Sequence, residues 1–211
     1  MKETICVNDL FFAKVKPNAI IPTKTEENAG RDVYACFDED YIVIKAHTTK
    51  LIPTGIASSM SSKYEIRLRD RGSNGSKGIH VNAGTIDSGF RGEWFVAWCN
   101  TNDTDVILSK LTMEELIDKY GERDDEDDFA IPTDVNKAIE KDKYGYFVGN
   151  TTYISVESFY SEPTIIYPYT KAIAQAEVCE VPVMNQYEIS YEELKEIPSN
   201  RGVGALGSTG K

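Results

Sequence analysis

The chain has 211 residues, with 23 Lys and Arg against 34 Asp and Glu, so its formal net charge is -11. Its composition, 41% hydrophobic and 27% charged, is typical of a globular protein, and its length fits one domain that carries an insertion. No apolar run approaches the roughly 18 residues that span a bilayer, and the first residues form no signal-peptide pattern. We therefore expect a cytoplasmic protein, and its acidity argues against binding to nucleic acid or membranes.

The acidity is concentrated in one stretch. Residues 101–160 hold 15 acidic and 6 basic side chains, a net charge of -9, whereas the other 151 residues hold 19 and 17, a net charge of -2. The densest run is 122–128, where all residues but Arg123 are acidic. The rest of the chain is nearly neutral, so the net charge does not exclude an anionic substrate.

In chain order, short β-branched or alternating segments between Gly, Pro and Asn signals predict strands. These segments are 41–45, 50–52, 64–69, 93–99, 153–156, 164–167 and 174–181. Two predicted helices flank the acidic run: one follows a capping box at Thr112 and Glu115, and the other runs from about 133 to 143. The pattern predicts an all-β barrel or jelly roll with a small helical and β insertion.

The strand 64–69 and the loop after it form the first candidate site. Alternation places Arg67, Arg69 and Arg71 on one face, beside a Gly- and Ser-rich loop whose N–H groups can turn inward. Guanidinium groups bind phosphate well, so the segment is a candidate phosphate cradle. The alternative is a solvated edge strand whose arginines pair with nearby acids.

The segment 80–93 is the second candidate site. Turn signals at 82–84 and 87–89 bracket a short apolar piece and predict a tight hairpin with exposed backbone edges, which can hydrogen-bond a flat base. Asp87 can orient a water as general base, and Phe90 offers its face to a ring. The alternative is an ordinary hairpin in which Asp87 only stabilises the turn.

The glycine-rich segment 201–211 is the third candidate. Such an arm can become ordered around a polyphosphate through Arg201, Ser208 and Thr209. It lacks the spacing of a P-loop, and the alternative is a frayed terminus.

The composition also restricts metal chemistry. The chain has only two histidines, and its four cysteines are scattered without CxxC spacing. This predicts reduced core cysteines rather than a zinc site or a disulfide framework. Any metal must then be held mainly by oxygen ligands or by a substrate.

Five motifs in order resemble those of the trimeric deoxyuridine triphosphatases (dUTPases), in particular the bacteriophage type with a large insertion. They are AGxD at 29–32, the Arg and Ser loop at 71–73, NAGxIDSG(Y/F)RGE at 82–93, IAQ at 173–175 and RGxGxxGSTG at 201–210. The resemblance implies a homotrimer of dUTPase-like subunits, each a β-clip or distorted jelly roll, with active sites shared between chains. It also implies the hydrolysis of dUTP to dUMP and pyrophosphate with Mg2+.

The resemblance further implies a role for each matching residue. Asp87 would activate the water that attacks the α-phosphorus, Phe90 would pack under the deoxyribose, and Asp32 would support Mg2+ through water, the ion being otherwise held by the substrate phosphates. The other implied contacts are to uracil (Asn82, Gly84, Thr85, Ile86), to the α- and β-phosphates or a metal-bound water (Arg71, Gly72, Ser73, Gln175), and from the arm to the base and γ end (Arg201, Leu206, Gly207, Ser208, Thr209).

Four positions depart from the family pattern. Gly72-Ser73 replaces Ser-Gly, Asp70 replaces a proline, Ala172 replaces an arginine, and Leu206 replaces a phenylalanine that stacks on uracil. We expect these changes to alter affinity and to leave the chemistry intact. Two alternatives remain: a dCTP deaminase, or a bifunctional enzyme, of the same fold, and a regulatory protein that senses nucleotide.

The segment between the hairpin and the IAQ motif is much longer than the family needs. The predicted boundaries are 1–106 and 164–211 for the dUTPase-like domain, with a flexible arm at 200–211, and 107–163 for an acidic subdomain. Insertions here are similar to those of some bacteriophage dUTPases, which contact protein partners such as repressors. We predict that residues 107–160 bind a basic protein surface; the alternative is a solvated decoration.

Overall fold

The structure is a computed structural model that describes residues 8–120, 122–123, 129–132, 153–155 and 164–199. Contacts divide the chain into two compact units, Met1–Val181 and Pro182–Lys211, and each is considered by itself. No helix among the described residues is long and apolar enough to cross a membrane.

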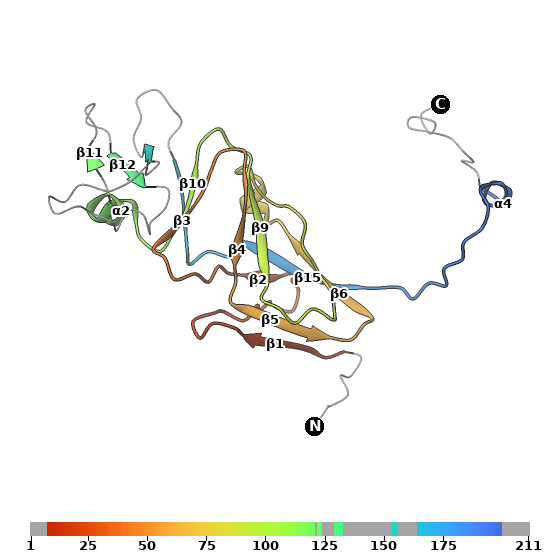
Figure 1. Ribbon diagram of the computed structural model, residues 1–211. Coiled ribbons are helices and arrows are strands. Elements are labelled where there is room, and N and C mark those ends of the chain that lie inside the picture. Colours follow the sequence, from red (N-terminus) through yellow and green to blue (C-terminus); the bar gives the residue numbers. More distant parts are fainter. Residues whose placement is uncertain (1–7, 121, 124–128, 133–152, 156–163, 200–211) are drawn as a thin grey trace. The chain divides into compact units, whose positions relative to one another are not determined.

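The first unit is built from short strands, most of them antiparallel (Figure 1). In chain order they are β1 (Leu10–Lys14), β2 (Arg31–Val33), β3 (Tyr41–Ile44), β4 (Thr49–Pro53), β5 (Ile56–Met60), β6 (Tyr64–Arg69), β7 (Ile79–Val81), β8 (Thr85–Ile86), β9 (Phe95–Asn100), β10 (Val106–Ser109), β11 (Glu122–Arg123), β12 (Phe129–Pro132), β13 (Tyr153–Ser155), β14 (Ile165–Pro168) and β15 (Ala174–Glu180). The described strands form sheets in the orders β1-β5, β14-β10-β3, β2-β15-β6-β8, β4-β9-β7 and β11-β12-β13. Each predicted strand is found, so the all-β prediction is confirmed.

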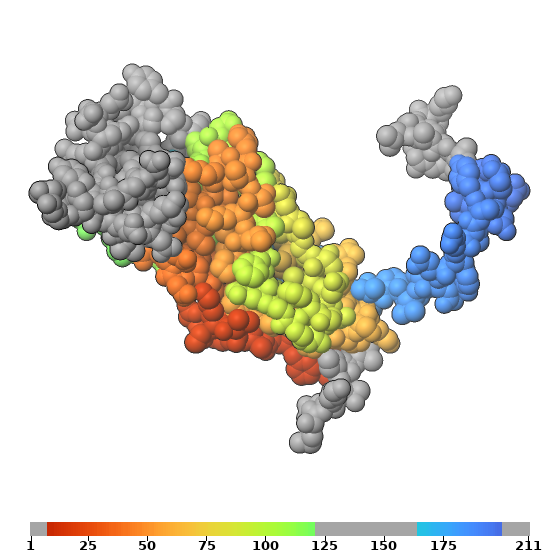
Figure 2. All heavy atoms as spheres, in the orientation of Figure 1, coloured from red at the N-terminus to blue at the C-terminus, as the bar shows by residue number. Residues whose placement is uncertain are grey.

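Alternation along the strands decides which face is buried. In β6, Ile66 and Leu68 are buried whereas Arg67 and Arg69 are exposed, as the sequence predicts. The largest fully buried side chains are Trp94, Trp98, Phe37, Ile44, Ile52, Ile56, Ile66, Ile79, Ile107, Leu108 and Leu116. They come from segments far apart in the sequence, and the same mixing of distant segments is visible on the outer surface (Figure 2). Burial of this apolar area is the main stabilising contribution to the fold.

The strands β10 and β14 pair in parallel, with Val106 opposite Ile165. Parallel neighbours need a crossover connection, and residues 110–164 provide it. Because β10 also pairs with β3, residues 107–109 belong to a sheet of the β body, the strands of the first unit other than β11, β12 and β13. The predicted start of the acidic subdomain, residue 107, thus lies within β10, and the bounds 107–163 stay a prediction.

Helix α2 (Met113–Tyr120) starts at the predicted capping box. The Thr112 N–H donates to Glu115 Oε2 at 2.8 Å, and the Glu115 N–H donates to Thr112 Oγ1 at 3.2 Å. The apolar face of α2 packs on the β body in a cluster whose buried members are Tyr41, Val43, Ile107, Leu116 and Tyr120. The prediction of this helix is confirmed, and packing holds it against the sheet that contains β10.

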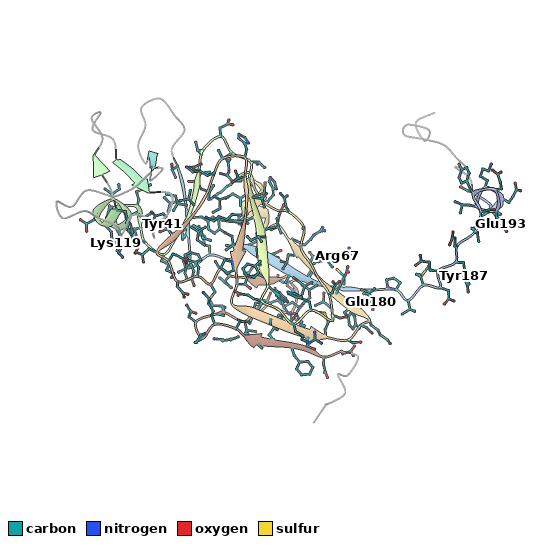
Figure 3. The ribbon with its side chains drawn as sticks, viewed as in Figure 1. Tyr41, Arg67, Lys119, Glu180, Tyr187 and Glu193 are labelled. Atoms are coloured by element: carbon teal, nitrogen blue, oxygen red, sulfur yellow. The ribbon has the colours of Figure 1, made fainter. Side chains whose placement is uncertain are left out.

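A polar anchor adjoins the apolar cluster. Asp40 accepts hydrogen bonds from Lys119 Nζ and from the Tyr120 hydroxyl, each at 2.5 Å. The Tyr41 and Tyr120 rings meet edge to face, 5.3 Å between centroids, and Tyr41 and Lys119 lie close together in Figure 3. The hydrogen bonds from Lys119 and Tyr120 lower the pKa of Asp40, and burial raises the pKa of Tyr120. The anchor is thus an ionised carboxylate held by two donors of one helix.

Beyond α2, the short strands β11, β12 and β13 form an antiparallel sheet, and α2 is in contact with β12. The helix predicted at 133–143 lies outside the described residues.

Of the cysteines, Cys36 is buried as predicted, Cys99 and Cys179 are half-buried, and these three are free thiols.

The second unit contains helix α4 (Tyr191–Glu196), which sequence reasoning missed. Its signal was present, since Ser190 and Glu193 have capping-box spacing and form that box in the structure. The Ser190 hydroxyl and backbone N–H hydrogen-bond the Glu193 carboxylate and lower its pKa.

We predict that Asp40→Ala lowers the free energy of unfolding at pH 7 by about 2 kcal/mol, because Lys119 and the buried Tyr120 hydroxyl lose their acceptor. The native pKa of Asp40 lies below its ordinary value of about 3.9, so its contribution is present above that value and is lost as the pH falls through the native pKa. Urea unfolding at pH 7 and pH 3 should show the difference between the two proteins shrinking at the lower pH. Asp118→Ala, an exposed change on the same helix, is the control, and equal stability of Asp40→Ala and wild type at pH 7 would contradict the anchor.

Candidate active site

Two adjacent backbone carbonyls tie the loop after β6 to the segment that leads into β15. The carbonyl of Ile173 accepts hydrogen bonds from Asn74 Nδ2 at 3.2 Å and from Trp98 Nε1 at 3.1 Å. The Tyr167 hydroxyl lies 2.7 Å from the carbonyl of Ala172 and 2.9 Å from Asn74 Oδ1. Asn74, Trp98 and Tyr167 are buried. A buried polar network of this kind is rigid when its members are satisfied, so it fixes the loop in place.

Arg71 begins this loop and turns toward β2. Its Nη1 donates to the carbonyl of Ala172 at 3.2 Å, and its Nε lies 3.2 Å from Asp32 Oδ1. That Nε is buried and makes no hydrogen bond of good geometry, although the side chain as a whole is 26% exposed. Gln175 lies directly opposite Asp32 in the β2–β15 pair. The structure thus brings together three of the predicted residues, Asp32, Arg71 and Gln175, which we call the phosphate cluster.

The predicted cradle of three arginines is not formed. β6 ends at Arg69, so the alternation stops before Arg71. Arg67 Nε lies 2.6 Å from Glu65 Oε1, and Arg69 Nε lies 3.8 Å from Glu177 Oε2. Arg67 and Arg69 therefore follow the alternative of exposed arginines paired with nearby acids, and only Arg71 belongs to the phosphate cluster.

The Gly- and Ser-rich loop forms one helical turn, α1 (Gly72–Gly75). Gly72 and Ser73 are exposed beside Arg71, and the Ser73 hydroxyl contacts only Asn74 Oδ1, at 3.5 Å, among the hydrogen bonds of the described residues. Asn74 is the member of the turn that points inward. Two predicted phosphate contacts, Gly72 and Ser73, are thus accessible next to the guanidinium.

The segment 79–86 does not form the predicted hairpin. β7 pairs with β9 and β8 pairs with β6, so the two halves of the segment belong to different sheets. The chain passes between them at Asn82, Ala83 and Gly84, which we call the crossing loop. The Gly84 carbonyl accepts the Leu68 N–H at 2.8 Å, and Gly84 has a φ of 148°. A Cβ at Gly84 would lie 2.8 Å from Leu68 Cβ, so close approach to β6 requires glycine here.

The predicted catalytic residue, Asp87, follows β8 in a turn closed by a 3.0 Å hydrogen bond from the Phe90 N–H to the Asp87 carbonyl. Both side chains are exposed, and the Phe90 ring lies over Gly92, where a Cβ would be only 2.6 Å from it. Thr85 is also exposed, whereas Ile86 is buried. The side chains of Asp87 and Phe90 are therefore accessible to a ligand or to another chain.

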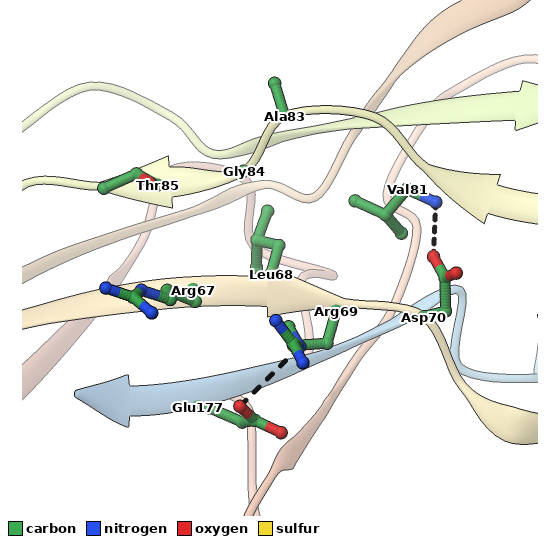
Figure 4. Close-up of a pocket in the computed structure, with 9 residues that line it drawn as sticks. All are labelled: Arg67, Leu68, Arg69, Asp70, Val81, Ala83, Gly84, Thr85 and Glu177. Atoms are coloured by element: carbon green, nitrogen blue, oxygen red, sulfur yellow. Dashed lines mark hydrogen bonds and ion pairs between the residues drawn. The ribbon is translucent and has the colours of Figure 1, made fainter. Parts of the chain in front are cut away.

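A pocket of about 590 Å³ opens between β6, β15 and the crossing loop (Figure 4). Its lining residues are Arg67, Leu68, Arg69, Asp70, Val81, Ala83, Gly84, Thr85 and Glu177. Volumes of this size are usual for small-molecule sites. The predicted uracil-reading backbone thus borders a concave surface with a polar wall.

Asp32 of the phosphate cluster and Asp87 lie at opposite edges of one sheet. Asp32 is on β2 and Asp87 follows β8, and these are the two edges of the order β2-β15-β6-β8. Three strand spacings place the edges about 14 Å apart. The register adds to this, because Gln175 is opposite Arg69 whereas Ile86 is opposite Ile66. A single chain therefore does not bring Asp87 to the phosphate cluster.

The described residues contain no group of three or more His, Cys, Asp and Glu side chains that could hold a metal ion. Asp32 is paired with Arg71, and Asp87 is separate from it. Carboxylate oxygens such as those of Asp32 are of the kind that Mg2+ prefers, so the residues present are compatible with this ion.

Some predictions fall outside the described part of the chain, and some structural residues were missed. The arm residues outside it are Arg201, Leu206, Gly207, Ser208 and Thr209. Sequence reasoning missed Asn74, Tyr167 and Trp98, which position the loop of Arg71. Asn74 sits in the Gly- and Ser-rich loop where a buried side chain is unexpected, and no local pattern links it to Tyr167.

A family model for dUTPase matches residues 16–112. The deoxyuridine 5'-triphosphate nucleotidohydrolase of Leptospira interrogans serovar copenhageni is 32% identical over 103 residues, 47% of this chain and 70% of that protein. The enzyme of the same name from Rickettsia bellii is 38% identical over 117 residues, 53% of this chain and 74% of that protein. The chain belongs to the dUTPase family.

Solved dUTPase structures share the fold over most of the chain. The Staphylococcus bacteriophage 80alpha dUTPase aligns with a TM-score of 0.57 at 20% identity, covering 95% of this chain and 98% of that one. A point mutant of the dUTPase from phage phi11 of S. aureus aligns with a TM-score of 0.54 at 16% identity, covering 88% of this chain and 99% of that one. The dUTPase jelly-roll fold predicted from the motifs is confirmed. Membership of the family of the deoxyuridine 5'-triphosphate nucleotidohydrolases gives the activity of this chain, dUTP diphosphatase.

We predict that Asp32→Ala raises the KM of this dUTPase for dUTP about tenfold, because Arg71 loses the carboxylate whose ion pair orients its guanidinium; a tenfold change corresponds to about 1.4 kcal/mol. Steady-state hydrolysis kinetics measure the change. Asp38→Ala is the matched control, since Asp38 forms a 2.9 Å ion pair with Lys16 on the surface of the β body. An Asp32→Ala enzyme with unchanged KM would show that Arg71 needs no partner.

Proposed function

We propose that the chain hydrolyses dUTP to dUMP and pyrophosphate by attack of an Asp87-activated water on the α-phosphorus, with Mg2+ bound to the substrate. The observation that best supports this proposal is the phosphate cluster. There, Asp32 and a backbone carbonyl hold Arg71, whose buried Nε makes no hydrogen bond. In the cytoplasm this reaction would limit uracil incorporation into DNA and supply dUMP.

The phosphate end of the substrate is bound by groups around Arg71. A preorganised guanidinium stabilises charge that develops on the phosphoryl oxygens, and its planar fork suits two oxygens at once. The exposed Ser73 and Gly72 adjoin it, and Gln175 holds a phosphate or a metal-bound water. Mg2+ neutralises phosphate charge when bound. The arm residues Arg201, Leu206, Gly207, Ser208 and Thr209 close over the base and γ end.

The base end is read by the crossing loop and β8. Exposed backbone groups of residues 82–86 pair with the uracil edges, and the Phe90 face packs against the deoxyribose. Asp87 then removes a proton from the attacking water, since an exposed carboxylate within hydrogen-bond reach of that water can act as general base.

The two ends of one substrate are served by different copies of the chain. The estimated 14 Å or more between Asp32 and Asp87 is too long for both to act at one α-phosphate. A homotrimer with shared active sites removes this difficulty, because the crossing loop of one chain can face the phosphate cluster of the next. The Staphylococcus phage 80alpha relative is described with dUpNHpp, and the phi11 relative with a structural Mg(II) ion.

A dCTP deaminase, the alternative of the same fold, is disfavoured by the relatives, which are nucleotidohydrolases of deoxyuridine 5'-triphosphate. Product analysis separates the two chemistries: pyrophosphate is released from dUTP by the hydrolase, and ammonia from dCTP by the deaminase.

A second role, binding a basic protein surface through residues 107–160, is supported by the position of this segment as a crossover that leaves the β body after Ser109. Phage 80alpha dUTPases are described as controlling transfer of virulence genes, and the phi11 dUTPase as having a species-specific insert. The 107–163 subdomain, less the three residues of β10, is the proposed unit of this role.

We predict that Asp87→Asn lowers kcat for dUTP about a hundredfold or more, because the amide cannot accept the proton of the attacking water. Binding of dUTP, followed by calorimetry in the presence of Mg2+, should change by less than about threefold, since the amide has nearly the same shape. Asp103→Asn, an exposed change on the β body, serves as control. An Asp87→Asn enzyme with near-normal turnover would refute the assigned role.

For the second role, we predict that replacing the acidic residues of 122–128 by their amides leaves kcat and KM for dUTP within about twofold. The same change should abolish salt-sensitive capture of a host protein from lysate, because paired opposite charges on exposed surfaces are screened by salt. Replacing the exposed Glu26, Glu27 and Glu39 of the β body by Gln is the matched control. Capture that persists unchanged in the 122–128 variant contradicts the acidic surface as the binding site.

A further inference from the structure

Asp70 joins the loop of Arg71 to the strand that leads into the crossing loop. It follows the last residue of β6 and directly precedes Arg71 in the chain. Its Oδ1 accepts the backbone N–H of Val81 at 2.5 Å, and its Oδ2 lies 3.1 Å from His80 Nδ1. Figure 4 shows the Asp70 carboxylate pointing across the pocket wall to Val81.

The contact is made at the open edge of a sheet. β7 is the edge strand of β4-β9-β7, with His80 opposite Cys99 and Val81 opposite Trp98 on its paired side. On its other side, no strand among the described residues pairs with β7. The Asp70 carboxylate occupies the place that a neighbouring strand would take. Asp70 itself directly follows β6, which is in the other sheet. It therefore links the two sheets where the chain crosses between them.

The other supports of the crossing loop come from the two sheets that the loop joins. The Asn82 N–H donates to the Ala97 carbonyl at 2.8 Å, and the Leu68 N–H donates to the Gly84 carbonyl at 2.8 Å. The Asn82 side chain donates to Thr49 Oγ1 at 3.0 Å. These bonds hold the first and the last residue of the loop, whereas Asp70 holds Val81, the residue through which the chain enters the loop.

We propose that Asp70 is a positioning residue for base recognition, whose carboxylate sets the start of the crossing loop by holding the N–H of Val81, the residue just before the loop. An ionised acceptor makes a stronger and shorter hydrogen bond than a neutral one, which suits a half-exposed position. The inference rests on the proposed reading of uracil by residues 82–86. It assigns to Asp70 an effect on binding and base selectivity, because Asp87 lies beyond β8, which has its own pairing with β6.

The test measures kcat and KM for dUTP and for dCTP in the full-length enzyme with Mg2+. Asp70→Ala should raise the KM for dUTP about tenfold, keep kcat within about twofold, and reduce the preference for dUTP over dCTP by about the same factor as the KM rises. Asp70→Asn should recover most of the KM and selectivity, since its amide oxygen can accept the Val81 N–H. Asp103→Ala is the matched control, because Asp103 forms a 2.9 Å pair with His47 on an exposed surface.

Three results would overturn the proposal: an unchanged KM in Asp70→Ala, a fall in kcat with constant KM, or an Asp70→Asn enzyme as impaired as the alanine variant. Should Asp70→Ala fold too poorly to assay, Asp70→Glu replaces it, since the extra methylene moves the carboxylate away from Val81 and should also raise the KM. Asp87→Asn distinguishes a failure of the proposed hydrolysis from a failure of the role of Asp70. If that variant loses turnover while Asp70→Ala behaves as wild type, the proposed chemistry stands and only the role of Asp70 fails.

Discussion

The candidate nucleotide site depends on two neighbouring carbonyls, those of Ala172 and Ile173. They receive donors from the loop after β6, from β9 and from the end of β14, so three parts of the chain meet at one buried point. β15 begins directly after Ile173 and carries Gln175 opposite Asp32. The same two carbonyls therefore set both the direction in which the Arg71 side chain points and the position of Gln175 along β15. Because the buried donors of Asn74, Trp98 and Tyr167 each have an acceptor at these carbonyls, displacement of the carbonyls would leave a donor unpaired at a cost of about 1–3 kcal/mol.

Much of the fold follows from local pattern. β6 alternates buried Ile66 and Leu68 with exposed arginines, and Thr112 with Glu115 starts α2 at the expected residue. The motifs also indicated Asp32, Arg71 and Gln175 individually. What local pattern could not supply was the choice of pairing partner. The turn signals at 82–84 are those of a hairpin, but β7 and β8 each find a better neighbour in β9 and β6, which are distant in the sequence.

The same limit explains the arginines. Alternation alone continues past Arg69, and only the buried Asn74, with its acceptor at Ile173, requires the chain to leave the strand and form a turn. Arg67 and Arg69 stay on the sheet face, where Glu65 and Glu177 pair with them. One arginine is thus separated from the other two by the end of a strand. The resulting site has a single guanidinium whose orientation is fixed, which suits recognition of phosphate better than three mobile ones, since less side-chain entropy is lost on binding.

The acidic insertion also follows from strand direction. An antiparallel pair of β10 and β14 could be closed by a short turn, but the observed parallel pair requires the chain to return to the starting edge. The connection must therefore leave the sheet, and its length and composition are free of the constraints of the β body. Asp40 and the Tyr41 cluster fix α2, the first helix of this connection, to the β body. The acidic run 122–128 follows this helix directly in the sequence. With -9 of the net charge of -11 in residues 101–160, the rest of the chain is left nearly neutral. A highly acidic dUTPase can on this account bind a triphosphate, because the charge resides in a crossover rather than in the strands that carry the phosphate cluster.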